Sequence, residues 1–308
     1  MRRYIIIIGA MKSGTTTLFD ALARHPAIAP ASNKEPGFFA FDDIHAKGYD
    51  WFDTLFDFDP AQHQYRLEAS TDYTKAPFVT GVWDRMTADP EVEVKLLYIM
   101  RHPLRRLESH ARHTETARRE IGQQISPRSS HSFEEGISPV SLATSAYAQQ
   151  LDHYQTAWSS GRLHCLTLEE LKSAPAETLA EIWRFLALDP PAGTDATTVP
   201  ASNMAVNKQK TSRLWETLTA IKPLLAAAKA VLPSGLQARL RDRFRTTAVV
   251  AEGRFALSPE ETAFFEQIYQ DDIARLQAYG IDTAQLWGLG DVQSVKTRRV
   301  VGRDPGRL

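Results

Sequence analysis

The N-terminal stretch constrains the fold more than any other part of the sequence. Residues 4–8 are mostly β-branched and stop at Gly9, a pattern typical of a central strand buried on both faces of a sheet. Over residues 16–24, apolar side chains recur at helical spacing until Pro26 ends the pattern. A strand, a glycine turn and a helix in this order predict the opening of a βα unit.

Further strands and helices alternate along the chain. Additional strands are predicted over residues 92–100 and 163–166, and additional helices over residues 104–120, after Thr167, after Pro175, and over residues 211–245 and 258–279. Parallel strands need crossover connections, which are usually helical. The alternation therefore predicts an α/β fold in which a central, mostly parallel sheet is flanked by helices.

Two irregular segments interrupt this alternation. Residues 32–62 are rich in aromatic side chains and are predicted to form a packed loop and short helices that line a pocket, with ordinary core packing accounting for most of the aromatic residues. Residues 121–142 contain Ser, Gly and Pro and are predicted to form a surface insertion. One domain is expected over residues 1–290, and a basic, disordered tail over residues 291–308.

Composition excludes several classes of protein. The 308 residues include 36 Lys and Arg against 37 Asp and Glu, so the overall field is not that of a nucleic-acid-binding protein. The apolar run over residues 5–8 is far shorter than the ~18 residues of a membrane span, and we expect no targeting segment. Cys165 is the only cysteine, which predicts a buried core thiol and a cytoplasmic protein.

The loop between the first strand and the first helix has the features of an anion-binding site. Its sequence over residues 9–17 is GAMKSGTTT. Glycines allow a ligand to approach the backbone closely, and the free amides and dipole at a helix start favour negative charge. We therefore predict that the loop binds a phosphate or sulfate group through Lys12, Ser13, Gly14, Thr15, Thr16 and Thr17.

The loop differs from the one found in nucleoside triphosphatases. That motif reads GxxxxGK[ST], with lysine directly after the second glycine, whereas Thr15 stands there in this chain and the lysine is Lys12. Metal-dependent hydrolysis also needs an acidic residue at a neighbouring strand end, but residues 92–100 run into Arg101. The pattern favours an anion site without a metal. A P-loop kinase or nucleotide hydrolase is the alternative, and a catalytically inactive nucleotide sensor is a third reading.

Several segments resemble the sulfotransferases that use 3′-phosphoadenosine 5′-phosphosulfate (PAPS). The sequence IIIIGAMKSGTTTLFDALARHPAI, followed by NKEPGFF, is most similar to the branch of heparan sulfate sulfotransferases and their bacterial relatives. The resemblance continues through EASTDYTKAP, SFEEGI, LTLEELKSAPAETLAEIWRFLAL and DDIARLQAYGIDTAQLW, and covers residues 4–287. It implies a P-loop-like three-layer fold and the in-line transfer of a sulfuryl group from PAPS to an acceptor hydroxyl or amine.

The resemblance also implies where PAPS binds. In the family the first loop binds the 5′-phosphosulfate, and an Arg with a Ser eight residues later binds the 3′-phosphate, which here are Arg101 and Ser109. A late loop closes over the nucleotide, and NKQKTSR over residues 207–213 is its best counterpart. The binding candidates in that loop are Lys208, Lys210 and Arg213.

Two residues carry the expected catalysis. The resemblance implies that Lys12 neutralises the charge that grows on the leaving phosphate oxygen, and that Glu35 is the general base for the acceptor. The alternatives are that Lys12 is merely a charged loop residue, that Glu35 forms a surface ion pair with Lys34, and that His45 is the base.

The acceptor is the least defined part of the prediction. Glu68, Asp72, Tyr73 and Lys75 lie in the acceptor-side segment of the family. Many glycan enzymes carry histidine and lysine where this chain has Gly37 and Ala69, so the resemblance does not extend to a heparan-like acceptor. The expected partners are PAPS, its product 3′-phosphoadenosine 5′-phosphate (PAP), and a hydroxyl-bearing acceptor, whether sugar, lipid or small metabolite.

Overall fold

A computed structural model of the chain describes residues 1–120, 137–191, 209–211, 245–247 and 256–289. By its internal contacts the chain divides into two compact units, one of Met1–Pro200 with Phe255–Leu308 and one of Ala201–Arg254. The expectation of one domain over residues 1–290 stays a prediction. The predicted tail over residues 291–308 lies outside the described residues, as does nearly all of the helix predicted over residues 211–245.

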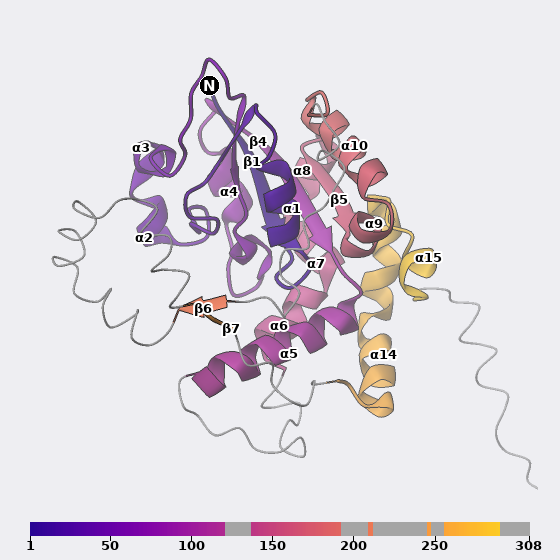
Figure 1. The fold of residues 1–308 in the computed structure, drawn as a ribbon. Helices are drawn as coiled ribbons and strands as arrows, with labels where there is room; N and C mark the ends of the chain where they lie inside the picture. Colours follow the sequence, from indigo (N-terminus) through magenta and orange to yellow (C-terminus); the bar gives the residue numbers. More distant parts are fainter. Residues whose placement is uncertain (121–136, 192–208, 212–244, 248–255, 290–308) are drawn as a thin grey trace, which may run out of the picture. The chain divides into compact units, whose positions relative to one another are not determined.

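A five-stranded parallel sheet forms the centre of the first unit (Figure 1). Its order is β2 (Ile28–Pro30), β3 (Tyr65–Glu68), β1 (Arg2–Gly9), β4 (Val92–Met100) and β5 (Leu163–Thr167). The two strands with the longest apolar runs, β1 and β4, are central, because only a strand covered on both faces buries every side chain. The strands predicted from sequence are confirmed, whereas β2 and β3 were not predicted.

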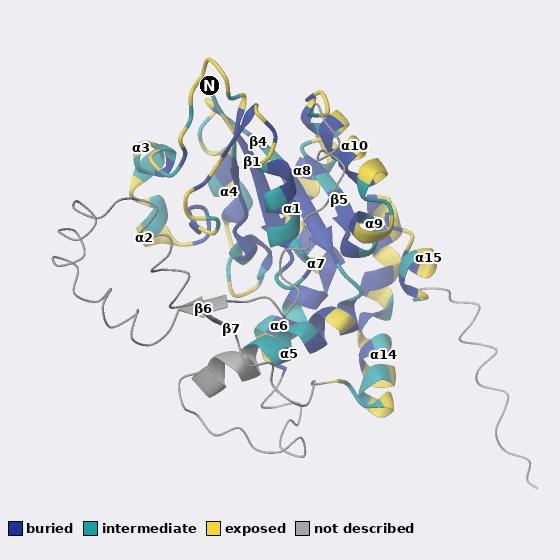
Figure 2. Ribbon diagram, viewed as in Figure 1, coloured by how far each residue is buried: buried dark blue, intermediate teal, exposed yellow. Residues whose placement is uncertain are grey.

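Alternate side chains of β1 enter two different cores. Ile5 and Ile7 pack against α1 (Thr15–Leu22), α9 (Leu168–Ser173) and α10 (Pro175–Leu186). Tyr4, Ile6 and Ile8 pack on the opposite face against α3 (Gly48–Asp53), α4 (Val82–Thr87) and α7 (Tyr147–Leu151). Figure 2 shows the strands as buried residues between these partly exposed helices. The predicted flanked parallel sheet is confirmed.

The remaining helices complete the first unit. They are α2 (Asp42–His45), η1 (Thr71–Thr74), α5 (Pro103–Glu120), α6 (Pro139–Ser145), η3 (Asp152–Tyr154), α8 (Gln155–Ser159), α14 (Pro259–Arg275), η5 (Leu276–Tyr279) and α15 (Thr283–Trp287). The predicted capping box at Thr167 and Glu170 is confirmed, and a second one starts α14. No helix within the described part of the chain is both long and apolar enough to span a membrane.

The second unit is described only at two short strands. β6 (Gln209–Thr211) and β7 (Arg245–Thr247) pair in antiparallel fashion, with Lys210 opposite Thr246.

The aromatic segment over residues 32–62 contributes to the core. Phe38, Phe39 and Phe52 are fully buried, and the rings of Phe38 and Phe52 stack with their centroids 4.2 Å apart. Large aromatic side chains gain most when their whole surface leaves water, which explains the density of such residues here. For these three residues, the expected core packing is confirmed.

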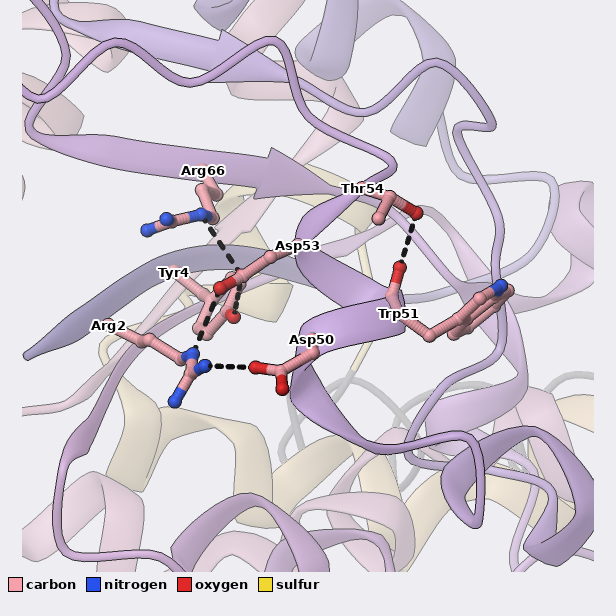
Figure 3. A network of polar contacts seen from close by, with 7 residues as sticks. All are labelled: Arg2, Tyr4, Asp50, Trp51, Asp53, Thr54 and Arg66. Atoms are coloured by element: carbon pink, nitrogen blue, oxygen red, sulfur yellow. Dashed lines mark hydrogen bonds and ion pairs between the residues drawn. The ribbon is translucent and has the colours of Figure 1, made fainter.

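A polar network at the start of β1 fixes α3 against the sheet (Figure 3). The carboxylate of Asp53 accepts hydrogen bonds from Arg2 Nε at 2.9 Å and from the Tyr4 hydroxyl at 2.6 Å. Arg66 Nε lies 3.1 Å from the same carboxylate. Burial, and then the hydrogen bond to Asp53, raises the pKa of Tyr4. One carboxylate therefore joins α3 to two neighbouring strands.

Replacing Asp53 by asparagine is expected to lower the free energy of unfolding by about 2 kcal/mol, because two charge-assisted hydrogen bonds and the ion pair with Arg66 lose the carboxylate charge. Asp50 is the matched control, since it binds the same Arg2 at 2.8 Å but its side chain is 98% exposed. Asp50→Asn should leave stability unchanged within error. Urea denaturation of both variants measures the difference, and equal effects would contradict the assigned role of Asp53.

Candidate functional site

Three chain segments that carry predicted site residues leave the sheet at the same edge. They follow β1, β3 and β4, and the carboxyl ends of parallel strands lie together. The first segment leads into α1 and the third into α5 (Figure 1), and the second leads into η1. Ligands in open α/β sheets bind at this edge.

The loop after β1 is too closely packed for side chains at its glycines. Gly9 has φ +146°, and a Cβ there would lie 2.1 Å from Thr74 Oγ1. Gly14 has φ +96°, and a Cβ there would lie 2.6 Å from Leu168 Cδ1. Lys12 has a φ of 71°, which costs a residue with a side chain about 1 kcal/mol. Surrounding packing therefore imposes the loop's conformation, as is common at ligand-binding sites.

The start of α1 is open to an anion. Gly14 is its N-cap residue, and no side chain caps the helix. The first amides of a helix have no partner within it, and its first turn contains no acidic residue to compete for them. Ser13 adds a fully buried hydroxyl beside Tyr147. The Ser13 hydroxyl oxygen has no hydrogen bond of ordinary geometry. A phosphate or sulfate oxygen fits this combination of donors.

Glu35 contacts Lys34, which itself contacts the anion loop, and it also contacts the segment after β3. Its Oε1 accepts a hydrogen bond from Lys34 Nζ at 2.7 Å, and the same Nζ lies 3.4 Å from Thr15 Oγ1. Its Oε2 accepts from Thr71 Oγ1 at 3.4 Å. The ion pair with Lys34 that the sequence left open is therefore present. It is not an isolated surface pair, because Lys34 connects Glu35 to the anion loop.

Arg106 lies beneath the anion loop and was not predicted as a site residue. It is fully buried, although its helix is rich in basic residues. Its guanidinium donates to Met11 O at 3.3 Å, to Ser145 Oγ at 2.6 Å, and to both the carbonyl oxygen and the hydroxyl of Ser141. No carboxylate among the described residues pairs with it. A buried guanidinium with only neutral acceptors directs positive potential at the loop.

The charges near His110 show that several cations share this edge. Burial lowers the pKa of His110 to about 3, and the positive charges of Arg106, Lys12, His113 and Lys75 lower it further. His110 is therefore neutral at pH 7. Residues from α5, from the anion loop and from the segment after η1 thus contribute to one region of positive charge, which is suited to a multiply charged anion.

Arg101 and Ser109 lie at the beginning of the third segment. Arg101 directly follows β4, and Tyr147 fixes its backbone by donating a hydrogen bond to its carbonyl oxygen at 2.7 Å. Both side chains are partly exposed, and neither has a side-chain partner within the described part of the chain. The two side chains are thus available to a ligand at the same sheet edge.

The three late candidates belong to the second unit, Ala201–Arg254. Lys208 and Arg213 lie outside the described residues. Lys210 belongs to β6 in the second unit. Their roles stay predictions.

His45, the alternative base, packs among aromatic rings. Its ring centroid lies 4.9 Å from that of Phe38, and burial lowers its pKa. The base candidate that contacts the anion loop through a polar partner is therefore Glu35.

The acceptor-side segment adjoins a cavity of about 180 Å³. Tyr73 and Ala76 line it together with Trp83, Gln150 and Tyr154. Within the segment, Lys75 Nζ donates to Asp72 Oδ1 at 2.6 Å. Among residues 1–120, 137–191, 209–211, 245–247 and 256–289, no group of three or more His, Cys, Asp or Glu residues is arranged to bind a metal ion.

Comparisons with known proteins agree with this arrangement. Residues 2–277 match the family model described as a sulfotransferase domain. The mouse heparan sulfate glucosamine 3-O-sulfotransferase 5 is 29% identical over 193 residues, which are 60% of this chain and 53% of the relative. The human bifunctional heparan sulfate N-deacetylase/N-sulfotransferase 2 is 27% identical over 207 residues, 60% of this chain and 22% of the relative.

The chain thus spans about half the length of the 3-O-sulfotransferases that it matches, and less of the bifunctional enzyme. Among solved structures, a sulfotransferase from Alicyclobacillus acidocaldarius aligns with a TM-score of 0.59 at 20% identity, covering 93% of this chain and 99% of that one. At this identity the similarity shows the fold alone.

Proposed function

The chain belongs to the sulfotransferase family, and from this premise we propose that it transfers the sulfuryl group of PAPS to the hydroxyl or amine of an acceptor. In this reaction the bond from sulfur to the bridging phosphate oxygen breaks while a bond from sulfur to the acceptor atom forms. PAP leaves with the electron pair of the broken bond, and the acceptor loses one proton.

The donor's 5′-phosphosulfate would bind to the loop after β1. The amides at the start of α1, the buried Ser13 hydroxyl and the hydroxyls of Thr15, Thr16 and Thr17 supply neutral donors there. Lys12 would lie beside the bridging oxygen and neutralise the charge that develops on it. The positive charge of the buried Arg106, which donates to the Met11 carbonyl oxygen of the loop, would attract the same anion.

Glu35 would accept the proton of the attacking group. The observation that carries this assignment is its hydrogen bond to Lys34, whose Nζ also lies 3.4 Å from Thr15 of the loop. A carboxylate and a sulfuryl-binding loop that share one lysine are close enough to act on the two reactants of a single transfer. Protonation of Glu35 would remove its negative charge and so break its ion pair with Lys34.

Arg101 and Ser109 would bind the 3′-phosphate, and Lys208, Lys210 and Arg213 would close over the nucleotide. An arginine can bind a phosphate with two parallel charge-assisted hydrogen bonds, and the partly exposed Arg101 side chain has no competing side-chain partner within the described part of the chain.

Arg101→Ala is expected to weaken PAP binding about 10- to 100-fold while changing AMP binding less than about threefold, because AMP lacks the 3′-phosphate. Isothermal titration calorimetry with both nucleotides measures the two losses. Arg105→Ala is the matched control, since Arg105 is exposed and pairs with Glu108 on the same helix. Equal losses for PAP and AMP would reject the assignment of Arg101.

We propose that no divalent metal takes part. The strand end where a P-loop kinase or hydrolase would place a magnesium-binding acid is occupied by Arg101, which repels a metal ion. No observation favours the kinase alternative over the transferase. A cytoplasmic location, expected from the single cysteine, stays a prediction.

The acceptor would be a sugar, a lipid or a small metabolite. The named relatives act on heparan sulfate, but Gly37 and Ala69 replace residues that serve acidic polysaccharide sites in that branch. In the structure Gly37 has a φ of 68°, and a Cβ there would lie 2.8 Å from Phe41 Cδ2, so the position has no room for a larger side chain without rearrangement. This packing supports an acceptor of a different class.

The test is to incubate the protein with sulfur-labelled PAPS and a cell extract in the presence of EDTA, and to identify the labelled product by mass spectrometry. We expect an organic sulfate ester or sulfamate, formed together with PAP. Label found only in inorganic sulfate, after broad acceptor testing, would contradict the proposed function.

A further inference from the structure

Glu68 is a buried carboxyl that the proposed reaction does not use. It is the last residue of β3, pairs in register with Ile6 of β1, and is fully buried. Its Oε2 accepts a hydrogen bond from the Ser70 amide at 2.8 Å, whereas its Oε1 has no hydrogen bond of ordinary geometry. An ionised carboxylate in such a place would be costly, because a fully buried charge loses its hydration.

Two hydroxyl groups near Glu68 accept hydrogen bonds from the backbone of residues 34–39, the segment that contains Glu35. The Ser70 hydroxyl oxygen accepts a hydrogen bond from the Gly37 amide at 2.9 Å. The Tyr73 hydroxyl oxygen accepts one from the Phe39 amide at 3.2 Å. A third bond runs from the Ala69 amide to the Lys34 carbonyl oxygen at 2.9 Å. The position of residues 34–39 thus depends on the residues that directly follow Glu68.

Through Ser70, the Glu68 carboxyl has a hydrogen-bonded connection to this segment: its Oε2 accepts from the Ser70 amide, and the Ser70 hydroxyl accepts from the Gly37 amide. The Ser70 and Tyr73 side chains also act on the pKa of Glu68, which they lower. A hydroxyl that points its proton at Glu68 would present its oxygen lone pairs to the amides of residues 34–39. Removal or ionisation of the Glu68 carboxyl would therefore disturb the Ser70 and Tyr73 hydroxyls, and through them the backbone segment that contains Glu35.

We propose that Glu68 is a positioning residue for Glu35, on which it acts as a buried and neutral carboxylic acid through two intervening hydroxyls. The inference rests on the proposed function, in which Glu35 is the base. With Glu68 neutral, Glu35 carries the only carboxylate charge of this pair. Ionisation of Glu68 would add a second negative charge near Glu35 and disturb the position of residues 34–39.

The charged and titratable groups around Glu68 agree with a neutral state at pH 7. Burial raises the pKa of Glu68 to about 8 against the opposing hydrogen bonds from Ser70 and Tyr73, and the charge of Glu35 raises it further. Tyr73 of η1 and Tyr154 of η3 also face it, and burial raises the pKa of both hydroxyls. Among the described residues, the groups that act on Glu68 thus include the Glu35 carboxylate and the Tyr73 and Tyr154 phenols, and the charge of none of these favours its ionised form.

The first measurement is the pH profile of kcat with saturating PAPS. The wild type should lose activity above pH 8, by up to about tenfold per pH unit, as Glu68 ionises. E68Q keeps a neutral carbonyl acceptor of the same size, so it is expected to retain most of the wild-type kcat at pH 7 and to show no loss between pH 7 and 9, since an amide cannot ionise. The matched control is E93Q, which removes a carboxylate that pairs with Arg3 at the far end of β4 and should keep the wild-type profile. An alkaline loss in E68Q equal to that of the wild type would overturn the proposal.

The second measurement is the pH dependence of unfolding, which needs no sulfotransferase activity. The folded protein retains a proton on Glu68 that the unfolded chain releases above about pH 4.5. The stability of the wild type relative to E68Q should therefore fall as the pH rises from about 4.5 to 8, and level off above that. A difference in melting temperature that does not vary with pH would overturn the neutral state of Glu68.

These two readouts separate the proposal from the function on which it rests. If the wild type transfers no sulfuryl group, the proposed function fails, and the unfolding series still decides whether Glu68 is neutral. If E68Q does not fold, S70A decides instead, because it removes one of the two intervening hydroxyls. S70A should then lower kcat at least about tenfold without changing the KM for PAPS, and an unchanged kcat would overturn the positioning role.

Discussion

Lys12→Ala is expected to lower kcat about 10²- to 10³-fold, which is the loss typical when one charge-stabilising donor is removed from a transition state. Sulfuryl transfer places negative charge on the departing phosphate oxygen, and Lys12 lies on the loop proposed to bind that group. Binding of PAP should fall much less than kcat, because much of the charge at this position exists only in the transition state. Rapid-quench kinetics with labelled PAPS measure the step.

The backbone geometry makes this substitution a clean one. Lys12 has a positive φ, which is equally unfavourable for alanine, so the change alters the side chain without changing the cost of the loop conformation. Lys172→Ala on the exposed surface of α9 serves as the control and should retain full turnover. A Lys12→Ala protein that turns over at a near-normal rate would refute the role of Lys12.

Glu35→Gln is expected to lower kcat about 10²- to 10⁴-fold with an alcohol acceptor, the range for loss of a general base. The glutamine keeps the size of the side chain, its amide oxygen can still accept a hydrogen bond from Lys34, and its NH2 group can donate one to the Thr71 hydroxyl. The melting temperature and the dissociation constant for PAP should therefore change little. Steady-state kinetics with a saturating acceptor, together with calorimetric binding of PAP, distinguish loss of a base from loss of structure.

The control for Glu35 tests the alternative base directly. His45 packs against Phe38 with a pKa lowered by burial, so His45→Gln should affect stability more than the shape of the pH profile. If Glu35→Gln retains full activity and His45→Gln does not, the two assignments are reversed.

Local pattern was sufficient to predict the elements that surround the anion loop. β1, the loop and α1 are contiguous, and apolar periodicity alone defines them. The capping box at Thr167 and the strand Val92–Met100 are equally local and were also predicted. β3 was missed because its four residues, YRLE, combine polar and apolar side chains in a run too short to show a period.

The parts of the site that sequence did not reveal depend on contacts between distant residues. Arg106 was not predicted as a site residue, because its partners Ser141 and Ser145 lie in α6, within or just after a stretch predicted as a surface insertion. The fold converts that arginine into a buried charge. Likewise, Glu68 is separated by about thirty residues from the segment that it positions, and no local period connects them. Only tertiary contacts show either role.

The central claim is that this sheet edge binds a nucleotide carrying both a 5′ and a 3′ anionic group without a divalent ion. Calorimetric titration of the wild-type protein with PAP, AMP and ATP in EDTA, repeated with Mg²⁺, tests it most directly. The account predicts that PAP binds at least about tenfold more tightly than AMP or ATP, with or without Mg²⁺. Equal affinity for PAP and AMP, or PAP binding only when Mg²⁺ is present, would contradict it.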